Sequence, residues 1–379
     1  MKTEFDFTFA DYPSRVLIRD EFPSVNEIIH AFYPAAGLAE ELPILAVCDT
    51  NTESLARKIL GDDNRKIRLL VLESGEKSKS WESVETILRA AVEAGLGRDG
   101  LFIGIGGGVT GDLTGFAASI YMRGSRLCLV STTLLGMVDA SLGGKTGIDL
   151  SGLKNLAGTF YPAELVYLPL AALYTLPERE WKSGMAELIK TAVLDSGEFL
   201  DLVKKLTFLE EEGRNSSVYR ECLKECISRS VAYKGRVVEA DPKETGTMRP
   251  LLNLGHTFGH ALEEAAGLGV ISHGEAVAWG MARACKLGLT LGITPPERAS
   301  EIIEILVNSG YETRTPHPLV KSVDSLMNAM MADKKQRSGH GFGVAKLRFI
   351  VPDAESARVV SASDILSGDT LLYKILSGE

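Results

Sequence analysis

The sequence has few cysteines and no long apolar run. Its five cysteines in 379 residues are few and odd in number, which favours free thiols in a reducing compartment over a disulfide framework. No apolar run is long enough to span a bilayer. The opening stretch, MKTEFDFTFADYPSR, places acidic residues among its first ten, unlike a secretory signal. We therefore expect a cytoplasmic protein without a membrane partner.

Positive charge is also in short supply. The chain has 41 Lys and Arg against 50 Asp and Glu, which gives a net charge of −9. This balance disfavours a nucleic-acid partner, because such partners select for basic surfaces. It leaves room for a small anionic substrate, provided that cations gather locally. The length fits two domains, and contents of 45% apolar and 24% charged residues are ordinary for a globular chain.

The first half of the chain alternates short apolar runs with helical patterns. After a short strand and helical material at Val25–Ala39, the runs LPILAVC, IRLLVLE, LFIGI, LCLVSTTL and ELVYLP read as buried strands. A helix is predicted between the second and third runs, at about residues 80–95. Such alternation is typical of a parallel nucleotide-binding sheet. We expect a Rossmann-like α/β domain over residues 1–175.

A glycine motif lies where such a sheet would bind a nucleotide. Gly106, Gly108 and Gly111 fit the pattern G-x-G-x-x-G, directly after the predicted strand at 101–105 and at the start of a predicted helix. Glycines let the backbone approach a pyrophosphate, and a helix N-terminus favours its charge. Asp112, just inside the helix, suits either a capping charge or a hydrogen bond to the ribose or nicotinamide side.

Residues 137–155 combine Asp139, a glycine pair, Lys145 and Lys154 among turn residues. We expect a loop there, which either binds an anion or lies solvated on the surface. From Pro177 the pattern becomes helical, with no strand alternation before residues 346–351 and a Gly- and Lys-rich loop at 332–344. The second domain, residues 176–379, is therefore predicted to be mostly α-helical with a late strand or two.

Histidines of the second domain gather in one stretch. His256 and His260 are four apart in a predicted helix and share one face, and His273 follows. This spacing suits a metal site, because imidazole binds zinc and similar ions, although capping histidines at a helix start would look the same. Glu187, at i, i+3 from Lys190 in the apolar stretch GMAELIK, is a natural carboxylate ligand; the alternative is a surface ion pair.

Cations accompany these motifs in an otherwise acidic chain. They are Lys145, Lys154, Lys190, Lys234 and Arg249. Next to a nucleotide domain, they indicate a substrate that carries phosphate and carboxylate groups. A metal would lower the pKa of a substrate hydroxyl, and a nicotinamide would accept its hydride. The resulting ketone would acidify a neighbouring C–H and permit elimination of phosphate.

The motifs together resemble a known family, the 3-dehydroquinate synthases of the sugar-phosphate cyclase group. The matching stretches include CDTN, GEKSK, GGGVTGD, YMRG, STTLLGMVDASLGGKTGID, GMAELIK, LNLGHTFGHALE and HGEAVAWGM. The resemblance implies an NAD-binding domain, a helical metal- and substrate-binding domain, and a homodimer. It also implies a lyase that converts 3-deoxy-D-arabino-heptulosonate 7-phosphate to 3-dehydroquinate and phosphate, within aromatic amino acid biosynthesis.

The resemblance also implies roles for individual residues. The implied ligands of zinc or cobalt are Glu187, His256 and His273. The implied NAD contacts are Asp49, Asn51, Glu76, Lys79, Gly107, Gly108, Val109, Asp112, Thr132, Thr133, Lys154, Asn155 and Thr175. The implied substrate-side groups are Asp139, Lys145, Lys190, Lys234, Arg249, Asn253 and His260. Arg123 matches an arginine that reaches the neighbouring subunit's phosphate site.

Some positions depart from the family pattern. The stretch between Glu244 and Arg249 is one residue longer, the Gln expected before Pro162 is missing, and the loop at 336–345 is extended, so that either Lys334 or Lys335 matches a further substrate lysine. Two other functions stay open at this point. One is another sugar-phosphate cyclase; the other is a metal-dependent polyol or glycerol(-phosphate) dehydrogenase, for which the cation cluster would be unnecessary.

Overall fold

The computed structural model describes residues 1–33, 43–61, 66–195, 197–211, 213–267, 269–320, 322–337, 348–361 and 368–378. The described chain forms two compact units. The first comprises Met1–Trp181 together with Lys234–Lys243, and the second comprises Lys182–Tyr233 together with Glu244–Glu379. The domain boundary expected at residue 175 stays a prediction.

The first unit is built on a seven-stranded sheet of order β1-β2-β9-β6-β5-β3-β4, in which only β1 runs antiparallel to its neighbour. Its strands are β1 (Glu4–Phe9), β2 (Tyr12–Arg19), β3 (Ile44–Asp49), β4 (Ile67–Leu72), β5 (Leu101–Gly106), β6 (Arg126–Ser131) and β9 (Leu165–Pro169). The five predicted apolar runs are thus all strands of one sheet. They are mostly apolar because the sheet is covered on both faces, whereas the edge strand β4 carries the exposed Arg68.

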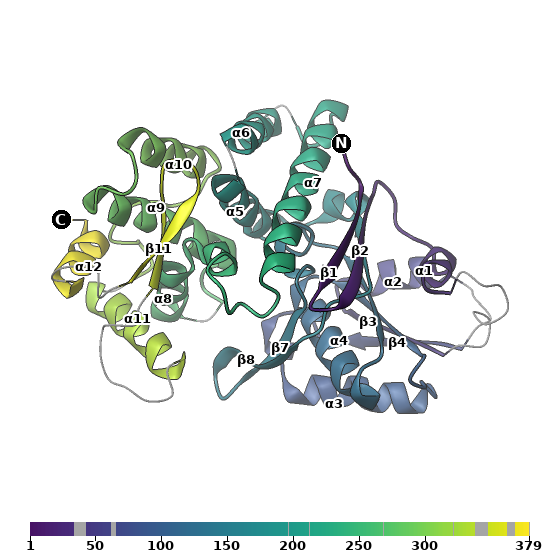
Figure 1. Ribbon diagram of the computed structural model, residues 1–379. Coiled ribbons are helices and arrows are strands. Elements are labelled where there is room, and N and C mark those ends of the chain that lie inside the picture. Colours follow the sequence, from purple (N-terminus) through teal and green to yellow (C-terminus); the bar gives the residue numbers. More distant parts are fainter. Residues whose placement is uncertain are drawn as a thin grey trace. The chain divides into compact units, whose positions relative to one another are not determined.

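Four helices cover the sheet (Figure 1). Helices α1 (Val25–Phe32) and α2 (Glu53–Leu60) share one apolar core with the strands, while α3 (Trp81–Glu93) and α4 (Gly108–Ile120) pack on the opposite face. The alternation of β5 shows this division: Ile103 and Ile105 belong to the core beneath α1 and α2, whereas Gly104 lies against Thr114 of α4.

The antiparallel edge strand was missed by the sequence prediction, which expected one short strand before α1. Phe5, Phe7 and Phe9 alternate with exposed residues along β1, and the chain reverses at Ala10 and Asp11, which have φ of 48° and 74°. Two consecutive positive φ values are typical of a type I′ hairpin turn. Neither residue is a glycine, so the usual sequence signal for this turn is absent.

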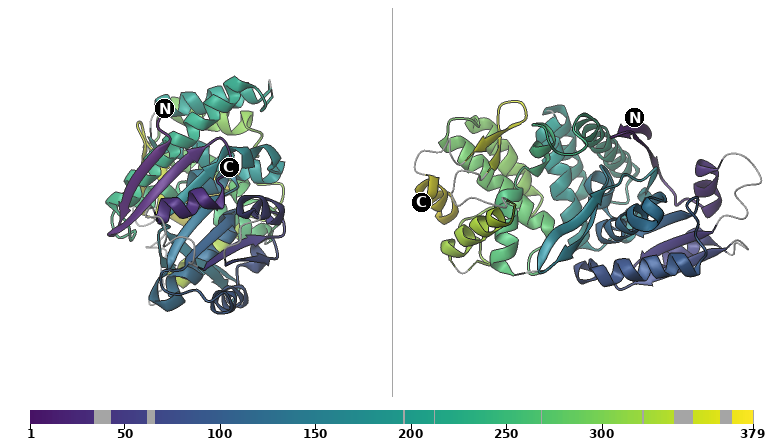
Figure 2. Two further views of the ribbon diagram at one scale, coloured as in Figure 1. Left: turned by 90° about the vertical axis from the view of Figure 1, so that its right-hand side faces the viewer. Right: turned by 60° about the horizontal axis from the view of Figure 1, so that its bottom comes forward.

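The loop predicted at residues 137–155 is also wrong. Gly136–Ala140 forms a π-helix, and β7 (Lys145–Leu150) pairs with β8 (Leu153–Phe160) in an antiparallel hairpin (Figure 2). Gly147 and Gly158 lie opposite each other, and a Cβ on Gly158 would come within 2.9 Å of the Gly147 Cα. Gly147, one of the glycines in the predicted loop, is therefore needed for close strand pairing.

The second unit is mostly helical, as expected. It contains most of α5 (Glu178–Asp195) and α7 (Ser217–Ala240), and all of α6 (Gly197–Glu211), α8 (His256–Ala266), α9 (His273–Thr290), α10 (Pro296–Asn308), α11 (Val323–Arg337), α12 (Gly368–Ser377) and the hairpin of β10 (Arg348–Pro352) and β11 (Ala357–Ser361). The prediction of a loop at 332–344 is wrong for residues 332–337, which belong to α11. Residues 338–347 and the side chains of Lys334 and Lys335 lie outside the described part.

Helices α8 and α9 pack against each other more closely than ordinary side chains allow. A Cβ on Gly280 would come within 2.9 Å of both the Gly255 carbonyl carbon and the Gly259 nitrogen. A Cβ on Gly259 would lie 2.9 Å from the Ala276 oxygen. Because glycines line both sides of this contact, the two backbones approach directly, and the histidines at the two helix starts are brought together.

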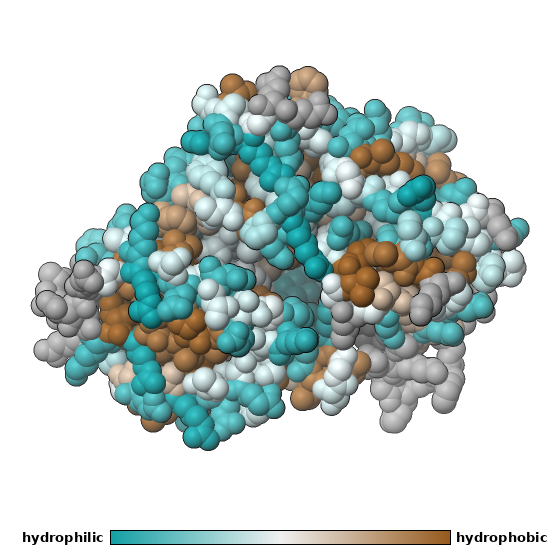
Figure 3. Space-filling view, turned by 180° about the vertical axis from the view of Figure 1, so that it is seen from behind, coloured by the Kyte–Doolittle hydropathy of each residue, from teal (hydrophilic) through white to brown (hydrophobic). Residues whose placement is uncertain are grey.

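Among the described residues, no helix is long and apolar enough to cross a membrane. On the face of the molecule that Figure 3 shows, hydrophilic residues surround separate apolar patches.

Candidate functional site

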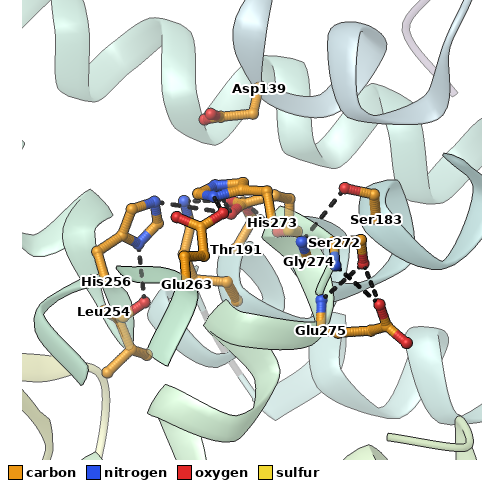
Figure 4. Close-up of polar contacts among 12 residues, drawn as sticks. Asp139, Ser183, Thr191, Leu254, His256, Glu263, Ser272, His273, Gly274 and Glu275 are labelled. Atoms are coloured by element: carbon orange, nitrogen blue, oxygen red, sulfur yellow. Dashed lines mark hydrogen bonds and ion pairs between the residues drawn. The ribbon is translucent and has the colours of Figure 1, made fainter. Parts of the chain in front are cut away.

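Three side chains of the second unit converge on one point. Glu187, His256 and His273 bring one ligand atom each within 4.8 Å of one another. The Oε1 atom of Glu187 lies 3.8 Å from His256 Nε2 and 3.5 Å from His273 Nε2. Figure 4 shows His256 and His273 approaching from different helices. Residues far apart in the sequence thus form one compact donor set.

Local structure fixes where each of these side chains starts. His256 is the first residue of α8, after Gly255 with φ of 82°. His273 is the first residue of α9, whose N-cap Ser272 forms a capping box with Glu275 (Figure 4). The next residue, Gly274, donates its backbone N–H to Ser183 Oγ at 3.2 Å. Ser183 lies one turn before Glu187 on α5, so this contact brings the carboxylate to His273.

Charge at the site is strongly influenced by burial. The Glu187 side chain is fully buried and pairs with Lys190, which is buried as well. Burial, together with the nearby Lys190 ammonium, holds the pKa of His256 well below its usual range. Burial lowers the pKa of His273 too, but hydrogen bonds with Glu187 and Glu263 outweigh it and raise that pKa to about 9.

The donor set fits a divalent metal ion. Two imidazoles and one carboxylate are the three protein ligands of many catalytic zinc sites, which leave a further position for water or substrate. The low pKa of His256 keeps its imidazole neutral, which is the form that binds a metal. A buried carboxylate also requires positive charge beside it, and an ion would add to what Lys190 supplies.

Further predicted residues belong to the second unit, and one of them lies beside the donor set. The ring of His260 lies 5.4 Å from that of His256 and 6.2 Å from that of His273, centroid to centroid. Arg249 is buried, and Asn253 Nδ2 donates to Glu244 Oε1 at 3.1 Å. Glu244, which borders the stretch with the extra residue, therefore contacts Asn253.

The glycine motif of the first unit forms a tight strand-to-helix turn. Helix α4 begins at Gly108 after Gly107, and a Cβ on Gly106 would lie 2.5 Å from Thr110 Oγ1. Thr110 Oγ1 donates to Asp49 Oδ2 at 3.3 Å, and Asp49 Oδ1 accepts the backbone N–H of Asn51 at 2.9 Å. The carboxyl ends of β3 and β5 are thus joined where open α/β sheets bind nucleotides.

Lys79 links the turn after β4 to helix α4 and to the β7–β8 hairpin. Its Nζ lies 2.6 Å from Asp112 Oδ2 and also donates to Asn155 Oδ1. Burial raises the pKa of Asp112 to about 6 despite the lysine beside it. Asp149 completes the link, because its backbone N–H donates to Lys79 O and its Oδ1 accepts the N–H of Asn155, both at 2.8 Å.

Asp139 and Lys234 also meet within the first unit. Lys234 Nζ donates to the Oδ1 and to the backbone oxygen of Asp139, each at 2.6 Å. Among the other predicted residues of this unit, the exposed ones are Arg123, Lys145, Lys154, Glu76 and Thr175, the part-buried ones are Val109 and Thr133, and Thr132 is buried.

Two residues at these sites escaped the sequence reasoning. Asp149 ties Lys79 to Asn155, and Glu263 lies 3.6 Å from His273 Nδ1 through its Oε1 (Figure 4). Glu263 carried a usable signal: it is seven residues after His256 and three after His260, so all three share one helix face. Asp149 carried none, because the hairpin that presents it was not predicted.

Comparison with known proteins connects these sites to a family. Residues 69–183 match the family described as 3-dehydroquinate synthase N-terminal, and residues 184–336 match 3-dehydroquinate synthase C-terminal. The 3-dehydroquinate synthase of Synechococcus sp. (strain CC9605) is 40% identical over 305 residues, which is 79% of either chain. The dehydrogenase and the other cyclases are not favoured by these matches.

Solved structures confirm the predicted fold class. A 2-deoxy-scyllo-inosose synthase complexed with carbaglucose-6-phosphate, NAD+ and Co2+ matches with a TM-score of 0.79 at 24% identity over 99% of either chain. ValA, the 2-epi-5-epi-valiolone synthase from Streptomyces hygroscopicus subsp. jinggangensis 5008 with NAD+ and Zn2+ bound, matches with a TM-score of 0.77 at 25% identity over 96% of either chain. With the two family matches spanning residues 69–336, the chain belongs to the 3-dehydroquinate synthase family.

Proposed function

We propose that this protein converts 3-deoxy-D-arabino-heptulosonate 7-phosphate to 3-dehydroquinate and inorganic phosphate, as a lyase that depends on NAD and one divalent metal. The single feature that carries the proposal is the donor set of the buried Glu187 with the part-buried His256 and His273, beside Lys190. Membership of the family supplies the reaction. A relative that is a 3-dehydroquinate synthase is 40% identical to this chain over 305 residues.

In this proposal the second unit holds the metal and the substrate's polar groups. Glu187, His256 and His273 would hold zinc or cobalt, and such an ion would supply the Lewis acidity that lowers the pKa of a substrate hydroxyl. Lys190 and Arg249, both buried, offer positive charge that a phosphate or carboxylate can pair with. Asn253 and His260, from the same stretch as His256, orient the substrate and move protons.

The first unit would hold NAD, which would supply a reversible hydride acceptor. Gly107, Gly108 and Val109 present backbone N–H groups at the start of α4, where a pyrophosphate is favoured. Lys79 and Asp112 form a buried ion pair beside that turn. The other proposed NAD contacts are Asp49, Asn51, Glu76, Thr132, Thr133, Lys154, Asn155 and Thr175.

Asp139, Lys145 and Lys234 are proposed to act on the substrate from the first unit. Lys234 Nζ is held by two oxygens of Asp139, and a lysine ammonium can bind a substrate anion. Lys145, exposed at the start of β7, adds a second cation.

We also propose a homodimer in which Arg123 reaches the partner's substrate. Arg123 is exposed, and both it and the exposed Met122 have positive φ, of 68° and 48°. Two such residues in succession hold a protruding, conformationally restricted turn, which suits a contact made in trans. A reducing, cytoplasmic location is proposed because all five cysteines are free and buried.

The test is an assay of purified protein with zinc or cobalt, NAD and the heptulosonate phosphate, in which phosphate and NADH absorbance are followed together. We expect phosphate release without accumulating NADH, lost with a chelator and in His256→Ala. His30→Ala, at an exposed position of α1, is the matched control and should keep full activity. Steady NADH from a polyol would instead support a dehydrogenase, and phosphate only from a sugar phosphate without a carboxylate would support another cyclase.

A further inference from the structure

His273 lies between two carboxylates. Its Nε2 is 3.5 Å from Glu187 Oε1, and its Nδ1 is 3.6 Å from Glu263 Oε1. The Glu263 side chain is only 10% exposed, whereas the next residue on α8, Glu264, is exposed. A buried carboxylate is costly unless it has a partner, so its place beside an imidazole nitrogen requires an explanation.

The two nitrogens of His273 cannot play the same part. A neutral imidazole carries one N–H and one lone pair, and the lone pair is what binds a metal. If Nε2 faces an ion shared with Glu187, then Nδ1 carries the hydrogen and needs an acceptor. Glu263 Oε1 is the carboxylate oxygen that lies there (Figure 4).

His256 shows the same arrangement with a different acceptor. Its Nδ1 lies 3.2 Å from the backbone oxygen of Leu254, and a carbonyl oxygen can only accept. His256 Nδ1 therefore carries the hydrogen, which leaves Nε2 free to face Glu187 at 3.8 Å. Both imidazoles thus present Nε2 to Glu187. The Nδ1 of His256 faces a main-chain oxygen, and the Nδ1 of His273 faces a side-chain carboxylate.

From this geometry we propose that Glu263 is a positioning residue that fixes the tautomer and orientation of His273 for metal binding. The inference rests on the metal role proposed above for Glu187, His256 and His273. Carboxylates that accept the second N–H of a ligating histidine also make it a stronger donor, and their loss commonly weakens metal binding by about 10- to 100-fold.

A second cluster offers a competing explanation for the same side chain. His260, Glu263 and His273 also bring ligand atoms within 4.8 Å of one another. An ion there would take the Nδ1 lone pair of His273 and move the hydrogen to Nε2, which faces Glu187. The buried Glu187 would then lose one of its two imidazole partners as a ligand, so the positioning role accounts for more of the structure.

The proposal is tested by metal affinity, which is independent of the reaction. Zn2+ and Co2+ dissociation constants are measured by chelator competition for wild type, Glu263→Gln and the matched control Glu264→Gln. We expect about 10- to 100-fold weaker binding in Glu263→Gln alone, together with a changed visible spectrum of bound Co2+. Glu263→Asp, which keeps the carboxylate, should recover part of the affinity.

Equal affinity in Glu263→Gln and Glu264→Gln would overturn the proposal, as would a wild type that binds neither ion. If Glu263→Gln fails to fold, nitrogen NMR of the wild type labelled at histidine decides instead. His273 must then carry its hydrogen on Nδ1 when Zn2+ is bound, and a hydrogen on Nε2 refutes the proposal. A wild type that binds metal but releases no phosphate would refute the proposed reaction and leave the role of Glu263 standing.

Discussion

Replacing Gly280 with alanine tests whether the close contact of α8 and α9 sets the metal site. The new Cβ would lie 2.9 Å from the Gly255 carbonyl carbon and from the Gly259 nitrogen, and closer still to the Gly255 oxygen. Carbon and oxygen atoms normally stay about 3.3 Å or more apart. Because these neighbours are backbone atoms of α8 and its N-cap, no side chain can rotate away, and the helices must separate by about 1 Å.

The expected cost follows from two opposing effects. Overpacking a buried contact costs about 1–3 kcal/mol, and a backbone clash belongs at the upper end of that range. Alanine recovers about 1 kcal/mol of helix propensity. The net loss is therefore about 2 kcal/mol, which lowers the melting temperature of a unit of this size by about 4–8 °C. The separation also exceeds the roughly 0.2 Å that metal–ligand distances tolerate, so Zn2+ should bind at least about tenfold more weakly.

The assay combines thermal unfolding with chelator competition for Zn2+. Gly197→Ala is the control, because a Cβ there meets no atom within 4 Å at the exposed start of α6. That variant should match the wild type within about 0.5 kcal/mol and bind Zn2+ normally. A Gly280→Ala protein with wild-type melting temperature and Zn2+ affinity would refute the reasoning that glycine contacts position His256 and His273.

Three other predictions concern separate parts of the chain. Thiol reagents should modify Cys222 before the other cysteines. The reason is that a hydrogen bond from Cys226 lowers the pKa of Cys222, whereas burial raises the pKa of the other four thiols. Mass spectrometry that finds another cysteine labelled first would contradict this prediction. Burial raises the pKa of Asp112 to about 6 from 3.8, so the folded state holds this proton more tightly and its stabilising effect is lost as pH rises from about 4 to 6. Urea unfolding should show the wild type losing up to about 3 kcal/mol over that range relative to Asp112→Asn, and parallel curves would disprove it. Gly235→Ala places a Cβ within 2.7 Å of the Phe7 ring and should cost about 1–3 kcal/mol by the same measurement, whereas an unchanged stability would show that the ring can move aside.

The sequence predicted best the features whose signals are local. Each apolar run became a strand of the parallel sheet, because burial on both faces imposes mostly apolar residues. The helical character of the second half likewise follows from its periodicity. Glu187 was linked to the histidines by ligand chemistry and by family resemblance, and the structure brings these side chains together, while their role as ligands remains a proposal.

Features that depend on contacts across the chain were not predictable. Much of the β7–β8 hairpin was taken for a loop because glycines such as Gly147 are read locally as turn residues, although Gly147 is required by the strand opposite it. Glu263 is an intermediate case: its spacing from His256 places it on the same helix face, but its burial depends on how other helices pack on α8. A single sequence shows which residues are small or charged, but not which backbone will lie against them.

The route of the chain through α7 has a practical consequence for dissecting the protein. Lys234–Lys243, at the end of that helix, belongs to the first unit, although the residues on either side of it belong to the second. A fragment cut after Trp181 would therefore lack the helical turn that meets Phe7 and the lysine that holds Asp139. Domain expression, linker insertion and circular permutation must therefore keep Lys234–Lys243 together with the first unit. Mixing two separately made fragments should restore the first unit only if one of them carries Lys234–Lys243.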